Sequence, residues 1–75
     1  MLHDVFARAL GIAVSSINDE SSPATLRRWD SLRHLDVMTA IEDAYSVRFS
    51  TAEILRATSV AQVRRLLREK GLVAD

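Results

Sequence analysis

The stretch from Asp30 to Tyr45 constrains the fold most strongly, because no glycine or proline interrupts it and its apolar residues recur at helical spacing. Apolar side chains at every third or fourth position predict a helix with one face towards a core. The residues on that face are Leu32, Leu35, Met38, Ile41 and Tyr45, with Val37 and Ala44 widening the stripe. Asp30 is a good N-cap for this helix, since its carboxylate can accept hydrogen bonds from first-turn N–H groups. A helix is therefore predicted over residues 30–45.

The chain before this helix divides into a short helix and a long loop. Apolar residues fall on one helical face across residues 2–11, and Gly11 predicts a left-handed end to that helix. Residues 13–29 are rich in serine and other turn-forming residues. Spaced apolar residues within this segment predict an ordered loop that is anchored on the core; they are Ile17, Leu26 and Trp29.

Two short helices are predicted after the long one. A serine followed three residues later by Glu or Gln is typical of a capping box, and this pattern begins at Ser50 and again at Ser59. The two boxes predict helices over residues 51–57 and 60–70. The apolar residues expected to face inward from the first of these are Ile54 and Leu55. Because no segment alternates as a strand would, the sequence predicts an all-α bundle of four helices.

Composition is that of a small globular domain. The 75 residues, of which 48% are hydrophobic, predict a single folded domain over residues 1–75. The absence of cysteine excludes disulfides and thiolate metal sites, which suits a cytoplasmic protein. Net charge is zero and no apolar run reaches the length of a membrane span, so the sequence predicts no membrane partner.

Catalysis and nucleic-acid binding are both disfavoured. Ser31 and His34 would share a helix face, as a nucleophile and its base can. Catalysis also needs a third group to orient the histidine and a pocket, for which a bundle of this size leaves little room. Four basic residues within 60–70 could form a phosphate-binding face, but no base-reading side chains accompany them. His3 lies far from His34 and predicts no metal site. We expect a non-enzymatic chain that binds neither metal nor nucleic acid.

The segment WDSLRHLDVMTAIEDAYSVRFS, from Trp29 to Ser50, resembles the phosphopantetheine-attachment region of acyl carrier proteins. These proteins have Asp-Ser-Leu at the head of a second helix, followed by aliphatic residues at helical spacing and an acidic end. The predicted order of helices also resembles theirs over nearly the whole chain, including the long loop and the short third helix. The resemblance implies a four-helix acyl-carrier-like bundle.

The same resemblance implies a chemistry. Ser31 would receive the 4′-phosphopantetheine group of coenzyme A, covalently, from a separate transferase that uses Mg²⁺. The thiol of that arm would then carry acyl groups as thioesters between acyl-loading and acyl-processing enzymes. A phosphodiester at a helix N-terminus would also meet free N–H groups and the positive end of the helix dipole.

The resemblance further implies that the second helix is the surface that partner enzymes recognise. Its acidic contacts would be Asp30, Asp36, Glu42 and Asp43. Leu32 would be the apolar residue beside the arm, and Phe49, just after the helix, would be an apolar residue that faces the partner. Trp29 is interpreted as a loop anchor packed on the core, in preference to an exposed aromatic beside the arm.

Arg33, His34 and Thr39 depart from the pattern of fatty-acid-synthesis carriers, which are also strongly acidic overall. A positive charge at Arg33 would weaken attraction to a generic basic partner. We therefore expect a discrete, monomeric carrier, starting at Met1, that serves one specialised biosynthetic pathway. Two alternatives stay open: an aminoacyl or peptidyl carrier, and a helical interaction module without a prosthetic group.

Overall fold

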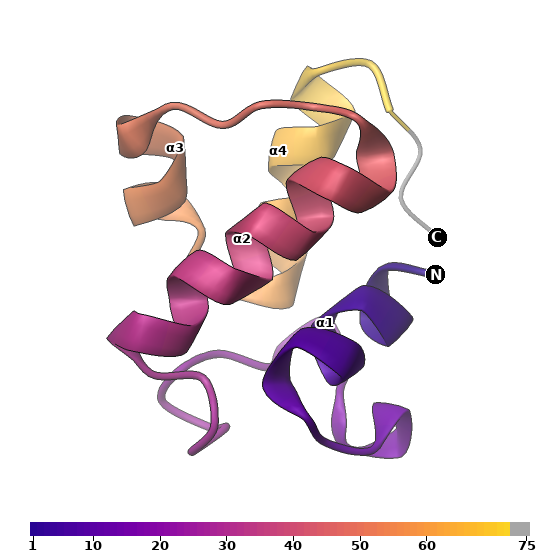
Figure 1. Cartoon of the computed structure of the whole chain (residues 1–75), viewed down its shortest axis with the longest axis vertical. Helices are drawn as coiled ribbons and strands as arrows, with labels where there is room; N and C mark the ends of the chain where they lie inside the picture. Colours follow the sequence, from indigo (N-terminus) through magenta and orange to yellow (C-terminus); the bar gives the residue numbers. More distant parts are fainter. Residues whose placement is uncertain (73–75) are drawn as a thin grey trace.

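Four α-helices and one 3₁₀ turn make up residues 1–72, the part of the chain that the computed structural model describes (Figure 1). The α-helices are α1 (Leu2–Leu10), α2 (Ser31–Tyr45), α3 (Thr51–Arg56) and α4 (Val60–Glu69). Their ends lie within one residue of the expected ranges, and the last three residues of the expected domain lie outside the described ones. Because residues 1–72 hold no strand, the predicted all-α fold is confirmed. None of the described helices is long and apolar enough to cross a membrane.

Local sequence signals account for most of the helix ends. Gly11 adopts the left-handed conformation (φ 68°), and its N–H donates to the carbonyl of Ala7, as predicted for the end of α1. Ser50 and Glu53 form the full capping box of α3. The second predicted box is only half formed within the described chain: Ser59 accepts from the Gln62 N–H, but the Gln62 side chain does not return the bond.

The long loop caps α4 and is anchored as predicted. Its carbonyl groups at Asp19 and Ser21 accept hydrogen bonds from the first-turn N–H groups of Ala61 (2.9 Å) and Val60 (3.0 Å). These bonds satisfy donors that a helix start leaves free. The anchoring side chains are Ile17 and Trp29, which are buried, and Leu26, which is partly buried. The loop also holds the unanticipated 3₁₀ turn, η1 (Val14–Ser16).

A charged junction joins this loop to two helices. The Asp19 carboxylate accepts from the Nε and Nη2 atoms of Arg64 on α4, at 3.1 and 2.9 Å. The Nε2 atom of His3 on α1 lies 2.7 Å from the same carboxylate. We call this set the Asp19 junction. Its aspartate side chain is 46% exposed, so water and salt screen the charges.

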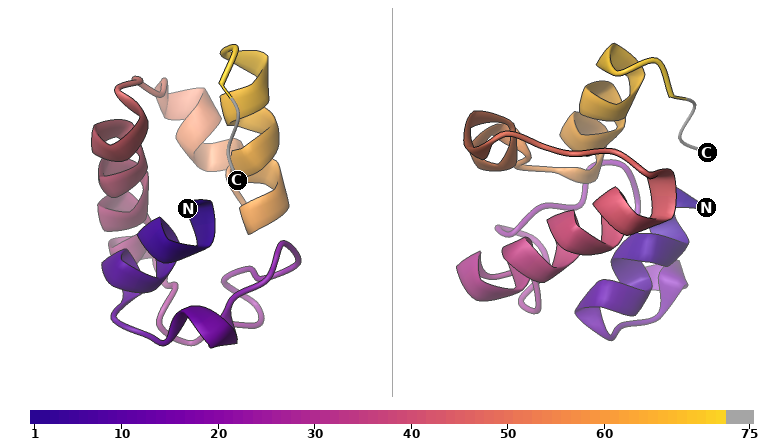
Figure 2. Two further views of the ribbon diagram at one scale, coloured as in Figure 1. Left: turned by 90° about the vertical axis from the view of Figure 1, so that its right-hand side faces the viewer. Right: turned by 45° about the horizontal axis from the view of Figure 1, so that its top comes forward.

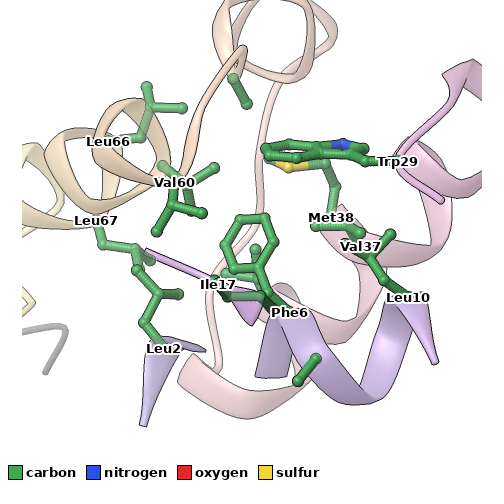
Figure 3. Close-up of a cluster of buried hydrophobic side chains, with 14 of the residues drawn as sticks. Leu2, Phe6, Leu10, Ile17, Trp29, Val37, Met38, Val60, Leu66 and Leu67 are labelled. Carbon is green, nitrogen blue, oxygen red and sulfur yellow. The ribbon is translucent and has the colours of Figure 1, made fainter. Parts of the chain in front are cut away.

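The core gathers side chains from α1, the loop, α2 and α4 (Figure 3). Trp29 is 1% exposed, and its ring meets that of Phe6 edge-on, with centroids 5.1 Å apart. This geometry is favourable for aromatic pairs. The preferred interpretation of Trp29 as a core anchor is therefore correct.

The predicted inward face of α2 was wrong at its N-terminal end. Leu32 and Leu35 are 80% and 57% exposed, whereas Val37 and Met38 are buried. The face that turns inward runs instead through His34, which is partly buried because its ring bonds to groups on both sides. The first turns of α2 also extend past α1 (Figure 1).

The short helix α3 lies between α2 and α4 and away from α1, as the left view of Figure 2 shows. Residues 46–50 cross from the end of α2 to its start (Figure 1). Ile54 is partly buried against the core, but Leu55 is 74% exposed, so the expectation that both face inward was wrong for Leu55. A helix of two turns can bury only a narrow stripe, and Ile54 takes it.

Candidate functional site

Ser31 lies at the surface, directly after two residues that are held in place by the fold. Trp29 is buried two residues earlier, and Asp30 caps α2 by accepting the Arg33 N–H at 2.8 Å through its side chain. The Asp30 carbonyl accepts the His34 N–H at 2.9 Å. Ser31 is thus the first residue of α2, and its side chain is exposed.

The surroundings of Ser31 fit a phosphodiester on its hydroxyl. Among the residues described, the hydroxyl of Ser31 and the backbone N–H groups of Ser31 and Leu32 make no hydrogen bond. Two donors and the positive end of the α2 dipole therefore lie beside the position that a phosphate would take. The Asp30 carboxylate lies there as well, and one of its oxygens is engaged in the cap.

An open, mostly apolar groove of about 370 Å³ adjoins Ser31. Ser31 and Leu35 line its α2 side, and Ile54 and Leu55 line its α3 side. Leu35 and Leu55 were expected to face the core, because helical spacing alone assigns both to an inward face, but both are exposed. The number of apolar residues could have identified Leu35 as a surface residue, because α2 carries more large apolar residues than one face can bury.

His34 reaches inward from the same turn of α2 and lines the groove. The indole N–H of Trp29 donates to its Nδ1 at 2.9 Å, and its Nε2 lies 2.8 Å from the carbonyl oxygen of Ile54. The Trp29 and His34 rings are stacked, with centroids 5.9 Å apart and 29° between planes. We call this set the His34 junction. His34 departs from the pattern of fatty-acid-synthesis carriers together with Arg33, but its ring is engaged inside the fold by these two bonds.

The acidic residues expected to meet partners differ in exposure and in the hydrogen bonds of their side chains. Asp36 and Asp43 are exposed, and within residues 1–72 their carboxylates make no hydrogen bond or ion pair. Glu42 is partly buried, and its Oε2 accepts the Phe49 N–H at 2.8 Å. Phe49 itself is 9% exposed and belongs to the core, with the Lys70 ammonium 5.5 Å from its ring centroid. The expectation that Phe49 faces a partner is therefore corrected.

Two ties hold α3 at the edge of the groove. At its first turn, the Lys70 ammonium lies 3.0 Å from the Glu53 carboxylate. The Ser50 backbone N–H and this ammonium hold the pKa of the Glu53 carboxyl below its ordinary value. Two residues before its end, the Ile54 carbonyl accepts from His34.

Comparison with known proteins agrees with this geometry. No curated protein matches the chain. A family model described as "Phosphopantetheine attachment site" matches residues 2–67, which include all four helix starts, the long loop and Ser31. Carrier domains of this kind are not enzymes themselves, and they interact with transferases and biosynthetic enzymes. This match argues against an interaction module without a prosthetic group. The chain belongs to the phosphopantetheine attachment family, and its cofactor is a covalently attached 4′-phosphopantetheine.

Proposed function

We propose that the chain is an acyl carrier protein that bears its arm on Ser31 and shuttles acyl thioesters between the enzymes of one specialised biosynthetic pathway. The observation that carries the proposal is the presentation of Ser31: an exposed hydroxyl at the first residue of α2, with an apolar groove beside it. When bound, the arm supplies the thiol that a chain without cysteine lacks.

The chain's own residues position the hydroxyl and offer a surface to partners. Trp29 and Asp30 fix the backbone on which Ser31 sits. Leu32 supplies an exposed apolar contact next to it, and the exposed carboxylates of Asp36 and Asp43 supply charge further along α2. Such charges steer a basic partner and set its register more than they add affinity.

Intact-protein mass spectrometry tests the attachment. The chain is incubated with coenzyme A, Mg²⁺ and a broad-specificity phosphopantetheinyl transferase, beside the variant Ser31→Ala. We expect a gain of one phosphopantetheine mass in the wild type and none in the variant. Ser46→Ala serves as the matched control and should load normally. A wild type that gains no mass, or a Ser31→Ala variant that does, overturns the proposal.

The apolar groove favours an acyl cargo over an aminoacyl one. An alkyl chain that leaves water for an apolar surface gains about 0.8 kcal/mol per buried CH₂, whereas a charged amino group gains nothing there. Octanoyl and alanyl forms of the arm are compared by amide hydrogen exchange at Ile54 and Leu55. We expect the octanoyl form alone to slow exchange. Equal exchange in the two forms contradicts the acyl assignment and leaves an aminoacyl or peptidyl carrier.

Arg33 is proposed to restrict the partners. It is partly exposed, follows Leu32 in α2, and adds a positive charge where fatty-acid-synthesis carriers usually have an acidic residue. Arg33→Asp should raise the rate at which fatty-acid-pathway enzymes load the carrier, by about fivefold at low salt and less at high salt. A rate that does not change, or that falls, removes Arg33 from the specificity surface.

A further inference from the structure

We propose that His34 is a positioning residue for reactions at Ser31: its bond to the Ile54 carbonyl holds α3 against the first turns of α2 and so fixes the wall of the groove that an acting enzyme meets. The proposal rests on the proposed function of Ser31, and it assigns to His34 a task that the attachment chemistry itself does not require.

The two partners of the His34 ring determine which of its nitrogens carries a proton. An indole N–H only donates, so the Nδ1 that receives the Trp29 bond carries no proton. A carbonyl only accepts, so the Nε2 that faces Ile54 does carry one. His34 is therefore neutral, with a single tautomer dictated by its two partners. The stacked Trp29 ring, itself buried in the core, fixes the plane of the imidazole.

The position of α3 depends on the bond between His34 and the Ile54 carbonyl. α3 has six residues, too few to be stable as an isolated helix. Within the described chain no α3 residue is fully buried, and its partly buried apolar side chain is Ile54. Its first turn is tied by Glu53 to Lys70, whose side chains are 18% and 26% exposed, but this pair joins α3 to the end of α4 and not to α2. Within residues 1–72, the bond from His34 is the only side-chain hydrogen bond between α2 and α3, and it adds to the packing of Ile54 on the core.

The position of α3 affects an enzyme that acts at the Ser31 hydroxyl. Ser31 and Leu55 line the same groove from opposite sides. Leu55 is 74% exposed, so an enzyme that brings its active site to the Ser31 hydroxyl meets Leu55 as it docks. If α3 moves, this apolar contact moves with it, while the hydroxyl stays on its capped helix start. The expected signature is weaker docking with unchanged chemistry.

Two amide substitutions separate the two bonds of the ring. Gln at position 34 places an N–H near the former Nε2 and keeps the donor for Ile54. Asn places its oxygen near the former Nδ1 and keeps only the acceptor for Trp29. Steady-state loading of the full chain by the transferase is measured for His34→Gln, His34→Asn and His34→Ala, with the carrier as the varied substrate. Val63→Ala on α4 is the matched control, because it weakens the core without touching the groove.

We expect His34→Asn and His34→Ala to raise KM for the carrier about tenfold with little change in kcat, and His34→Gln to restore KM to within about twofold. Amide exchange at Ala57 and Thr58 should accelerate in the first two variants only. Val63→Ala should leave KM unchanged. Wild-type KM in His34→Asn, or equal impairment in His34→Gln and His34→Ala, overturns the proposal while Ser31 remains the attachment site. The separate failure of wild-type loading, or loading of Ser31→Ala, is a failure of the proposed function.

Discussion

The Asp19 and His34 junctions have the same design, because in each of them one side chain connects three parts of the fold. They differ in the charge of the groups involved and in their place in the molecule. Asp19 joins α4 through an ion pair with Arg64 and α1 through a hydrogen bond with His3, both at the surface. His34 joins Trp29 and α3 through a neutral ring stacked on a buried indole, beside the groove at Ser31. We infer that the first junction serves the fold alone and that the second serves both the fold and the site.

This difference has a physical basis. Screened charges contribute little net stability, and they can be removed without leaving a buried group unpaired. The indole N–H of Trp29, by contrast, would be left buried without a partner if the His34 ring were removed, and that costs about 1–3 kcal/mol. Substitutions at the two junctions should therefore differ in both size and kind.

The largest effect is expected at the core end of the His34 junction. Trp29→Ala should lower the free energy of unfolding by about 3–5 kcal/mol, because it leaves a cavity and removes the donor to His34. Trp29→Phe keeps most of the ring and should cost about 1 kcal/mol for the lost bond. Urea unfolding followed by circular dichroism measures both, since the only tryptophan is lost. Equal costs for the two variants would mean that packing of the ring contributes little.

A smaller effect is expected at the Asp19 junction. Asp19→Ala should lower the free energy of unfolding by about 1 kcal/mol, and the loss should shrink in 1 M salt as screening removes the wild-type advantage. Loading at Ser31 should be unchanged. Glu20→Ala is the control, because Glu20 is an exposed neighbour whose side chain has no partner among the described residues. A change in the KM of loading for Asp19→Ala would break the distinction between the two junctions.

The contribution of Asp19 should also depend on pH. Hydrogen bonds from Arg64 and then from His3 hold the pKa of its carboxyl below the ordinary value. A group whose pKa is lowered by folding stabilises the fold above its unfolded pKa, and this contribution is lost as the pH falls through the folded pKa. The difference in unfolding free energy between wild type and Asp19→Asn should be present above the unfolded pKa of the carboxyl and should disappear in acid. A difference that persists below the folded pKa contradicts this assignment.

The smallest effect on stability is expected at the groove. Leu55→Ala should change the free energy of unfolding by less than about 0.5 kcal/mol, since the side chain is 74% exposed. It should nevertheless raise the KM of transferase loading about fivefold, as about 1 kcal/mol of apolar contact is lost. Leu35→Ala tests the opposite side of the groove. Unchanged loading in both variants would show that enzymes do not touch the groove walls.

The sequence predicted those features that depend on neighbours in the chain. Gly11 and Asp30 mark helix ends because their effects act within one turn. The family resemblance likewise rested on a short motif and the order of helices. The inward direction of His34 could not be predicted, because its partner Ile54 lies 20 residues away and is brought near only by the fold.

The same limit explains the errors at Leu35 and Leu55. Helical spacing identifies an apolar residue, but the position of the neighbouring helix decides whether it is covered. At Phe49 the opposite happened: the residue was assigned to the surface by resemblance, and its backbone bond to Glu42 and its packing hold it in the core.

Peptide mapping of the loaded protein tests the central claim most directly. Cleavage after Arg28 and Arg33 releases residues 29–33, Trp-Asp-Ser-Leu-Arg, in which Ser31 has the only aliphatic hydroxyl. After incubation with coenzyme A, Mg²⁺ and a transferase, this peptide should carry the mass of 4′-phosphopantetheine, and no other peptide should. Recovery of the group on a peptide that contains Ser46 or Ser50 instead would contradict the assignment of Ser31.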